Sequence, residues 1–166
     1  MTRYDDTIYI AGLQSLYNVG ATYVRRFIED FGSPYEAWNA VKNVENLKGY
    51  TYISIADKRA IAASARDEKL DYITQKLDEY QMDVTTFLDK DFPSMLNQIY
   101  NPPAILFMRG NRALLDKRLN RIAIVGARRC SLYGRNVARM LGKELGKYST
   151  IIVSGGARGI DSHGHE

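Results

Sequence analysis

The sequence has a single cysteine, Cys130, so no disulfide bond can form within the chain. This sparing use of cysteine is typical of proteins from a reducing compartment, and we expect a cytoplasmic protein. No apolar run approaches the ~18 residues that a membrane-spanning helix needs. The first residues, MTRYDDTIYIAG, are acidic and lack the apolar block of a secretion leader. We therefore expect neither secretion nor a membrane partner.

Three well-known ligand-binding or catalytic motifs are also missing. The glycine that follows Gly126 is Gly134, eight residues later, so the dinucleotide-binding pattern G-x-G-x-x-G is not met. No Gly-Lys-Ser/Thr of a nucleoside-triphosphate loop occurs, and nothing forms the G-x-S-x-G elbow around Ser154. His163 and His165 lie in one short acidic stretch without matching ligands elsewhere. The sequence predicts no cofactor, no metal and no catalytic residue.

Positive charge is concentrated in the second half of the chain. Residues 1–90 contain 11 Lys/Arg and 14 Asp/Glu, whereas residues 91–166 contain 12 and 5, for a total net charge of +4. Arginine is densest between Arg109 and Arg139. Such an asymmetry indicates a phosphate-bearing partner for the second half, although a solvated basic surface would have the same composition.

The sequence pattern of the first 66 residues predicts a small bundle of helices. Apolar residues at helical spacing before and after Asn18-Val19-Gly20 indicate two helices joined by a tight turn, and Gly32 ends the second. Ser33 and Pro34 are suited to the N-cap and first position of another helix. The hairpin at Gly20 resembles a helix-hairpin-helix module, which can present backbone N–H groups to DNA, but many such hairpins are purely structural. Trp38 is interpreted as a packing residue.

From residue 67 the pattern changes to short apolar strands alternating with helices. Candidate strands cover residues 83–88, 104–108, 122–125 and 151–153. Unbroken apolar strands are typical of parallel sheets buried on both faces. A helix marked by Val137, Leu141 and Leu145 would connect the last two strands as a βαβ unit. The predicted fold class is therefore α/β, with a helical domain over residues 1–66 and part of a parallel sheet over residues 67–166.

The last two strands each end in a glycine-containing, arginine-bearing turn. Parallel strands bring their carboxyl ends to one edge of a sheet, where open α/β proteins bind ligands. Glycine allows a close approach of backbone, and a following helix offers free N–H groups to an anion. Arg128, two residues after Gly126, is expected either to pair with a phosphate or to form an ion pair with Asp161. Ser131 is expected to cap the next helix or to bind the same phosphate, and Asp161 to cap a helix or orient Arg128.

Four ordered motifs then point to a known family: FPSML (92–96), PAILFMRGN (103–111), IAIVGARRCSLYG (122–134) and VSGGARGIDSHGH (153–165). They resemble the core motifs of the DNA processing protein A family (DprA, also called Smf). The resemblance covers about residues 70–166, and the helical region before it resembles the accessory SAM-like domain of that family. One departure is Gly164, where the family usually has alanine.

The resemblance implies an extended Rossmann-like domain that binds single-stranded DNA without catalysing a reaction. It further implies protection of incoming DNA, loading of the RecA recombinase and a homodimer in the full-length protein. Arg128 matches the family arginine that contacts a DNA phosphate. The other matching or neighbouring positions expected to line or shape the pocket are Gly126, Arg129, Ser131, Tyr133, Gly134, Arg135, Gly155, Gly156, Arg158, Gly159, Asp161 and His165.

Two alternatives belong to other functional classes. Related Rossmann-like folds cleave nucleoside monophosphates, with a glutamate that follows a glycine pair as the acid. The run Pro-Gly-Gly-x-Gly-Thr-x-x-Glu of those enzymes is not found here, and Glu166 is the only acid after Asp161. The helical region could instead be a protein-interaction module on a basic scaffold. Binding of a partner independently of DNA would favour that interpretation.

Overall fold

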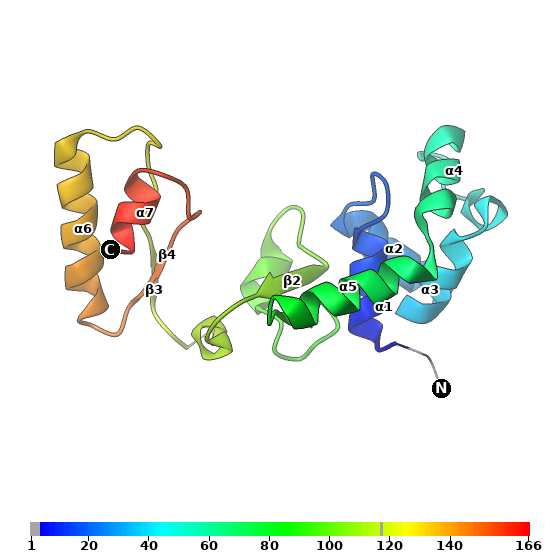
Figure 1. Cartoon of the computed structure of the whole chain (residues 1–166), viewed down its shortest axis with the longest axis horizontal. Coiled ribbons are helices and arrows are strands. Elements are labelled where there is room, and N and C mark those ends of the chain that lie inside the picture. Colours follow the sequence, from blue (N-terminus) through cyan, green and yellow to red (C-terminus); the bar gives the residue numbers. More distant parts are fainter. Residues whose placement is uncertain (1–3, 117) are drawn as a thin grey trace. The chain divides into compact units, whose positions relative to one another are not determined.

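The computed structural model describes residues 4–116 and 118–166. It divides into two compact units, Met1–Gly110 (unit 1) and Asn111–Glu166 (unit 2), which are shown in Figure 1. The sequence suggested a boundary between residues 66 and 67 instead. The compact division falls later because three elements after residue 66 contact helix α1 (Asp6–Gln14) of the same unit. They are helix α5 (Asp67–Glu79) and strands β1 (Asp83–Thr86) and β2 (Ile105–Met108). By composition, unit 1 has a net charge of −3 and unit 2 of +7.

Unit 1 begins with helices whose ends follow the sequence signals. Gly32 has a left-handed φ of 91° and ends the second helix, as predicted. Ser33 Oγ accepts a hydrogen bond from the Glu36 N–H, and Pro34 begins the next helix, which confirms the predicted cap. The helical elements of unit 1 up to residue 79 are α1 (Asp6–Gln14), α2 (Ala21–Phe31), α3 (Pro34–Val41), the 3₁₀ helix η1 (Val44–Leu47), α4 (Ile55–Ser64) and α5 (Asp67–Glu79).

The core of unit 1 forms where α1, α2, α3 and α5 meet. Trp38 is 1% exposed and Leu70 is fully buried, so the packing role predicted for Trp38 is confirmed. The Trp38 Nε1–H donates to Asp67 Oδ1 at 2.8 Å. Gly12 of α1 lies so close to these side chains that a Cβ there would come 2.9 Å from the Trp38 ring. This small residue therefore allows α1 to approach α3 and α5.

Strands β1 (Asp83–Thr86) and β2 (Ile105–Met108) also belong to unit 1. They pair antiparallel, with Asp83 opposite Met108 and Thr86 opposite Ile105. The sequence placed these strands with the later ones in a parallel sheet, which is wrong: the described strands form two separate two-stranded sheets. The physical reason is that β2 returns beside β1 and buries Ile105 in the helical core. The connection between them includes the 3₁₀ helix η2 (Ser94–Gln98).

Unit 2 contains the predicted βαβ unit. Strand β3 (Arg121–Ala123) pairs in parallel with β4 (Ile151–Val153), and helix α6 (Leu132–Gly146) connects them. The register places Ile122 opposite Ile152, and the Ile124 N–H extends the pairing to the Val153 carbonyl. Helix α7 (Ile160–Gly164) follows β4, and the 3₁₀ helix η3 (Arg112–Leu115) precedes β3. The parallel pairing and crossover helix are confirmed.

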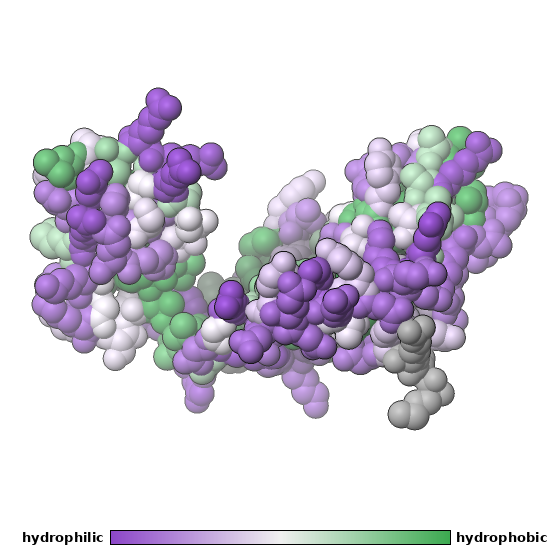
Figure 2. All heavy atoms as spheres, viewed as in Figure 1, coloured by the Kyte–Doolittle hydropathy of each residue, from purple (hydrophilic) through white to green (hydrophobic). Residues whose placement is uncertain are grey.

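The strands of unit 2 are less buried than their apolar sequence indicates. Ile122 is 41% exposed, Val153 43% and Val125 67%, so the expectation of burial on both faces is wrong for these residues. A groove of about 510 Å³, lined mainly by apolar residues, runs between β3 and α6. Figure 2 shows hydrophobic side chains at the surface over the part of unit 2 that contains β3 and β4. The cause is that this sheet has only two described strands, and helices α6 and α7 cover only part of its surface.

Helix α6, with 15 residues, is the longest helix within residues 4–116 and 118–166. Across these residues, no helix combines the length and apolar character needed to cross a membrane.

Candidate nucleic-acid interface

The two glycine turns of unit 2, residues 126–131 after β3 and residues 154–159 after β4, lie against each other at the carboxyl ends of these strands. The Ile160 N–H donates to the Ala127 carbonyl oxygen at 3.2 Å, which joins the second turn to the first. Gly159 has a φ of 91°, and a Cβ at this position would lie 2.6 Å from the Arg128 carbonyl oxygen. Because this contact is between backbones, only glycine fits. The juxtaposition expected from parallel strands is therefore present.

Asp161 connects the two turns through its carboxylate. Its Oδ1 accepts a hydrogen bond from the Gly126 N–H at 3.2 Å, and its Oδ2 accepts one from the Gly155 N–H at 3.0 Å. The side chain is buried, with 6% exposure. The sequence suggested that Asp161 caps a helix or orients Arg128. In the structure its carboxylate binds backbone N–H groups from both turns.

The Ile160 side chain packs against the first turn. Nothing in the sequence alone singled out this residue. A Cβ on Gly126 would lie 2.8 Å from Ile160 Cγ1, and one on Gly134 would lie 3.2 Å from Ile160 Cδ1. The glycines at these two positions therefore admit the isoleucine side chain between strand end and helix α6. The spacing of glycines showed that something approaches closely, but it could not show that the approaching group belongs to the chain itself.

Two polar side chains of the site have clear local partners. Ser131 Oγ accepts a hydrogen bond from the Gly134 N–H at 3.1 Å and so caps α6, the first of the two roles expected for it. Ser154 Oγ lies 2.8 Å from His165 Nε2 and also accepts the Gly156 N–H. A Ser-His-Asp triad needs an acid behind the histidine, whereas the Asp161 carboxylate binds Gly126 and Gly155. The Ser154–His165 pair therefore holds the second turn in shape.

Exposed arginines surround the two turns. Within the part of the chain that the structure describes, four of them make no side-chain hydrogen bond or ion pair: Arg128, Arg129, Arg135 and Arg158. In the first turn, the N–H groups of Ala127, Arg128 and Arg129 likewise donate to no described group. Guanidinium groups and free N–H groups are the donors that oxyanions bind. The site thus offers an unneutralised positive surface.

The acidic residues of unit 2 are each occupied elsewhere. Asp116 pairs with Arg118, Glu144 with Lys147, and Glu166 with Arg139 and His163, while Asp161 binds the two glycine N–H groups. Hydrogen bonds from Arg118 lower the pKa of Asp116 to about 2, so this carboxylate stays charged and paired. None of these four acids contacts the arginines at the turns. The positive charge around the turns is therefore not compensated within the described residues of unit 2.

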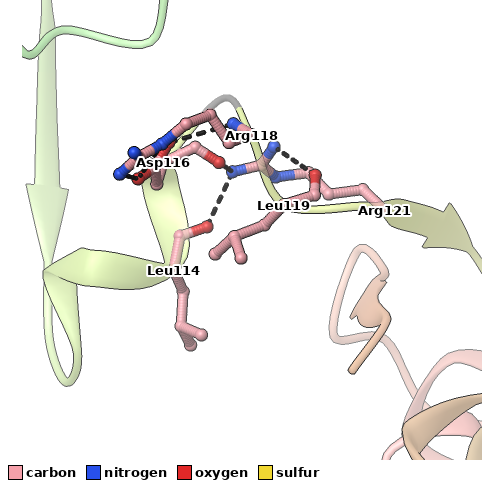
Figure 3. Close-up of polar contacts among 5 residues, drawn as sticks. All are labelled: Leu114, Asp116, Arg118, Leu119 and Arg121. Atoms are coloured by element: carbon pink, nitrogen blue, oxygen red, sulfur yellow. Dashed lines mark hydrogen bonds and ion pairs between the residues drawn. The ribbon is translucent and has the colours of Figure 1, made fainter. Parts of the chain in front are cut away.

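Arg121 differs from its neighbours in sequence because its side chain is structural. Its guanidinium group donates to the carbonyl oxygens of Leu114, Asp116 and Leu119, at 2.8, 2.6 and 3.1 Å, as Figure 3 shows. These bonds hold the end of η3 next to the start of β3. Arginine density alone could not separate this anchoring residue from the exposed arginines.

The remaining predicted residues lie at different places around the turns. Gly156 has a φ of 65° and shapes the second turn. Tyr133, 78% exposed, and Arg135 lie in the first turn of α6, where Tyr133 lines the apolar groove. Among the described residues, no three His, Cys, Asp or Glu side chains gather as a metal site would require.

Comparison with known proteins identifies the family. A model of the family "DNA recombination-mediator protein A" matches residues 83–166, which is half of the sequence. The chain belongs to this family. Residues 83–166 contain both glycine turns of unit 2 and strands β1 to β4. The resemblance drawn from the four sequence motifs is thereby confirmed.

Individual proteins named DprA are also similar to this chain in sequence and in structure. The DNA processing protein DprA of Bacillus subtilis (strain 168) is 45% identical over 76 residues, which cover 46% of this chain and 25% of that protein. The X-ray structure of DprA from Streptococcus pneumoniae matches 99% of this chain and 53% of its own, with a TM-score of 0.67 and 25% identity. It supports the mixed architecture of a helical region followed by short strands.

A third relative is DNA processing protein A from Helicobacter pylori, whose structure concerns a single-stranded DNA binding mode of that protein. The match has 35% sequence identity and covers 52% of this chain and 38% of the Helicobacter chain. Its TM-score is 0.44. The chain thus spans about half the length of the pneumococcal protein and matches a quarter of the length of the Bacillus relative.

Proposed function

We propose that this chain binds the phosphate backbone of single-stranded DNA at the two glycine turns of unit 2, without sequence preference and without catalysing a reaction. The observation that carries this proposal is the uncompensated positive charge at the turns. Arg128, Arg129 and Arg158 are exposed and unpaired among the described residues, whereas the acids of unit 2 are occupied elsewhere. Membership of a family of DNA recombination mediators is in keeping with a nucleic-acid partner.

The mode of binding follows from the kind of donors at the site. Arginine guanidinium groups pair with phosphate oxygens in a planar fork, and the free N–H groups of the first turn can bind the same anion. Such contacts read the backbone and not the bases, so affinity would be electrostatic and would fall steeply with salt. The glycines and Asp161 shape the site, while the arginines contact DNA.

The decisive experiment is a fluorescence-anisotropy titration of labelled oligo-dT at several salt concentrations. Arg128→Ala should weaken binding and flatten the dependence of log K on log salt by about 0.7 to 1 unit, because one phosphate contact is lost. Arg118→Ala is the matched control: it removes the same charge from unit 2, but at a residue paired with Asp116. Equal losses in both variants would show that net charge, and not the turns, determines binding.

The wider role is proposed for the whole protein, on the basis of family membership. We propose that it acts in the cytoplasm as a homodimer, protects incoming single strands in natural transformation and loads RecA. The test is RecA filament formation on single-stranded DNA with and without the whole protein. As the supporting fold, we propose that residues 1–66 are a SAM-like domain containing a helix-hairpin-helix turn. We also propose that residues 67–166 begin an extended Rossmann-like domain, whose further elements would cover the exposed apolar groove at β3.

A further inference from the structure

The place where an anionic ligand would be expected in unit 2 is already taken. In open α/β folds, ligands bind outside the carboxyl ends of the parallel strands, against the N–H groups of the turns that follow. Here the N–H groups of Gly126 and Gly155 both donate to the carboxylate of Asp161, one to each oxygen. The chain itself therefore supplies an anion between its two turns.

This carboxylate has no positively charged partner among the described residues. Asp161 is 6% exposed, and its bonds are to two backbone N–H groups from turns that lie 29 residues apart in the sequence. A buried charge is costly unless hydrogen bonds compensate it, and bonds to a charged acceptor are the stronger ones. Both oxygens are thus needed, and each binds one turn. A Cβ on Gly155 would lie only 3.0 Å from Asp161 Oδ2, so the carboxylate lies directly against the backbone of the second turn.

We infer that Asp161 is a positioning residue that serves as a built-in anion between the glycine turns, and that it keeps DNA phosphate outside, at Arg128 and the free N–H groups next to it. This inference rests on the proposed function for its second part only. The first part concerns how unit 2 holds its turns together. Removing the carboxylate should therefore leave a space that a small anion can occupy. DNA binding should also depend on Asp161, because this residue holds the two turns in place even though its own charge repels phosphate.

The test measures thermal unfolding of Asp161→Ala and of the unchanged chain in sodium chloride and in sodium formate at equal ionic strength. Formate is the carboxylate that the substitution removes. We expect the variant to unfold about 5–10 °C lower in chloride and to regain much of this loss in formate. The unchanged chain should respond equally to both salts. Asp116→Ala is the control, because it removes an exposed carboxylate that pairs with Arg118 and binds no glycine turn.

Asp161→Asn keeps the test decisive if the alanine variant fails to fold. Asparagine has nearly the same shape, but its NH₂ group cannot accept a hydrogen bond and would face one of the two glycine N–H groups. We expect a lower Tm than for the unchanged chain, and no recovery in formate because the space is filled. An asparagine variant as stable as the unchanged chain would overturn the inference, as would an alanine variant that folds without any response to formate.

Oligo-dT binding by the same proteins separates this inference from the proposed function. Asp161→Ala should bind at least about tenfold more weakly in chloride and recover in formate, with the salt dependence of the unchanged chain. A steeper salt dependence would mean that a phosphate enters the vacated place, which contradicts the second part of the inference. If formate restores stability while no form of the protein binds DNA, the built-in anion stands and the proposed function fails.

Discussion

The backbone of Gly159 lies directly against the carbonyl oxygen of Ala127. Gly159 has a φ of 91°, and the next residue, Ile160, donates its N–H to that same carbonyl at 3.2 Å. The two turns of unit 2 are therefore in direct backbone contact at this point, in addition to the bonds that both make to the Asp161 carboxylate. This contact determines where Arg128 and Arg158 emerge, so it connects the stability of unit 2 to the shape of its charged surface.

Gly159→Ala should consequently disrupt both turns. An added Cβ would meet backbone atoms of Ala127 and Arg128 at a φ that alanine rarely adopts, so no side-chain rearrangement can relieve the clash. We expect a loss of at least about 2 kcal/mol in the stability of unit 2 and weaker oligo-dT binding. Hydrogen exchange of residues 121–125 and 151–155 measures the first effect. Gly146→Ala is the control, because a Cβ there meets nothing within 4 Å and should leave both properties unchanged or slightly increase stability.

Arg121→Met should weaken the start of β3 without changing how the protein responds to salt. The substitution removes three hydrogen bonds to the carbonyl oxygens of Leu114, Asp116 and Leu119, so we expect a loss of about 1–2 kcal/mol. Hydrogen exchange in residues 114–123 should increase. The salt dependence of oligo-dT binding should stay as in the unchanged chain, and a flatter dependence would instead place Arg121 on the DNA.

Leu70→Ala should destabilise unit 1. Leu70 is fully buried beside Trp38, and removing its side chain leaves a cavity that costs about 2–5 kcal/mol. Trp38 is the only tryptophan in the sequence, so its fluorescence in a urea titration reports this unit. Leu88→Ala changes a leucine that is 49% exposed and should shift the transition by less than about 0.5 kcal/mol. Similar shifts for both variants would contradict the proposed packing.

Tyr50→Phe should alter how the stability of unit 1 depends on alkaline pH. Burial and a hydrogen bond from the Tyr50 hydroxyl to Asp30 Oδ2, 2.8 Å long, raise the pKa of Tyr50 well above its usual value near 10. The folded state therefore favours the neutral phenol. Its contribution is complete below about pH 10 and is lost as the pH rises from there toward the higher folded-state pKa.

Urea titrations at pH 8 and at about pH 11 test this expectation. The difference in stability between the unchanged chain and Tyr50→Phe should be larger at pH 8 and should shrink at the higher pH. Comparison of the two proteins at each pH removes the contribution of the other tyrosines, which both proteins share. A difference that stays constant would show that the hydroxyl titrates alike in the folded and unfolded states.

Local sequence determined most of the element boundaries and the place of the two glycine turns that form the candidate site. Caps such as Ser33 and Ser131, the left-handed Gly32 and the apolar periodicity act within a few residues, so they are readable without a structure. The parallel pairing of β3 with β4 follows equally from the sequence, because a crossover helix between two apolar strands has essentially one arrangement. The concentration of arginine near the turns is a property of composition.

Tertiary structure alone decided which groups meet. The sequence does not show that Asp161 joins two turns or that Arg121 binds three carbonyl groups. Nor does it show that Ile160 fills the space at Gly126. The antiparallel pairing of β1 with β2 and the exposure of Val125 were likewise not predictable. Local patterns record what a residue prefers. Its partners are chosen by chain packing, which brings together groups far apart in sequence and leaves other groups, such as Arg128, at the surface.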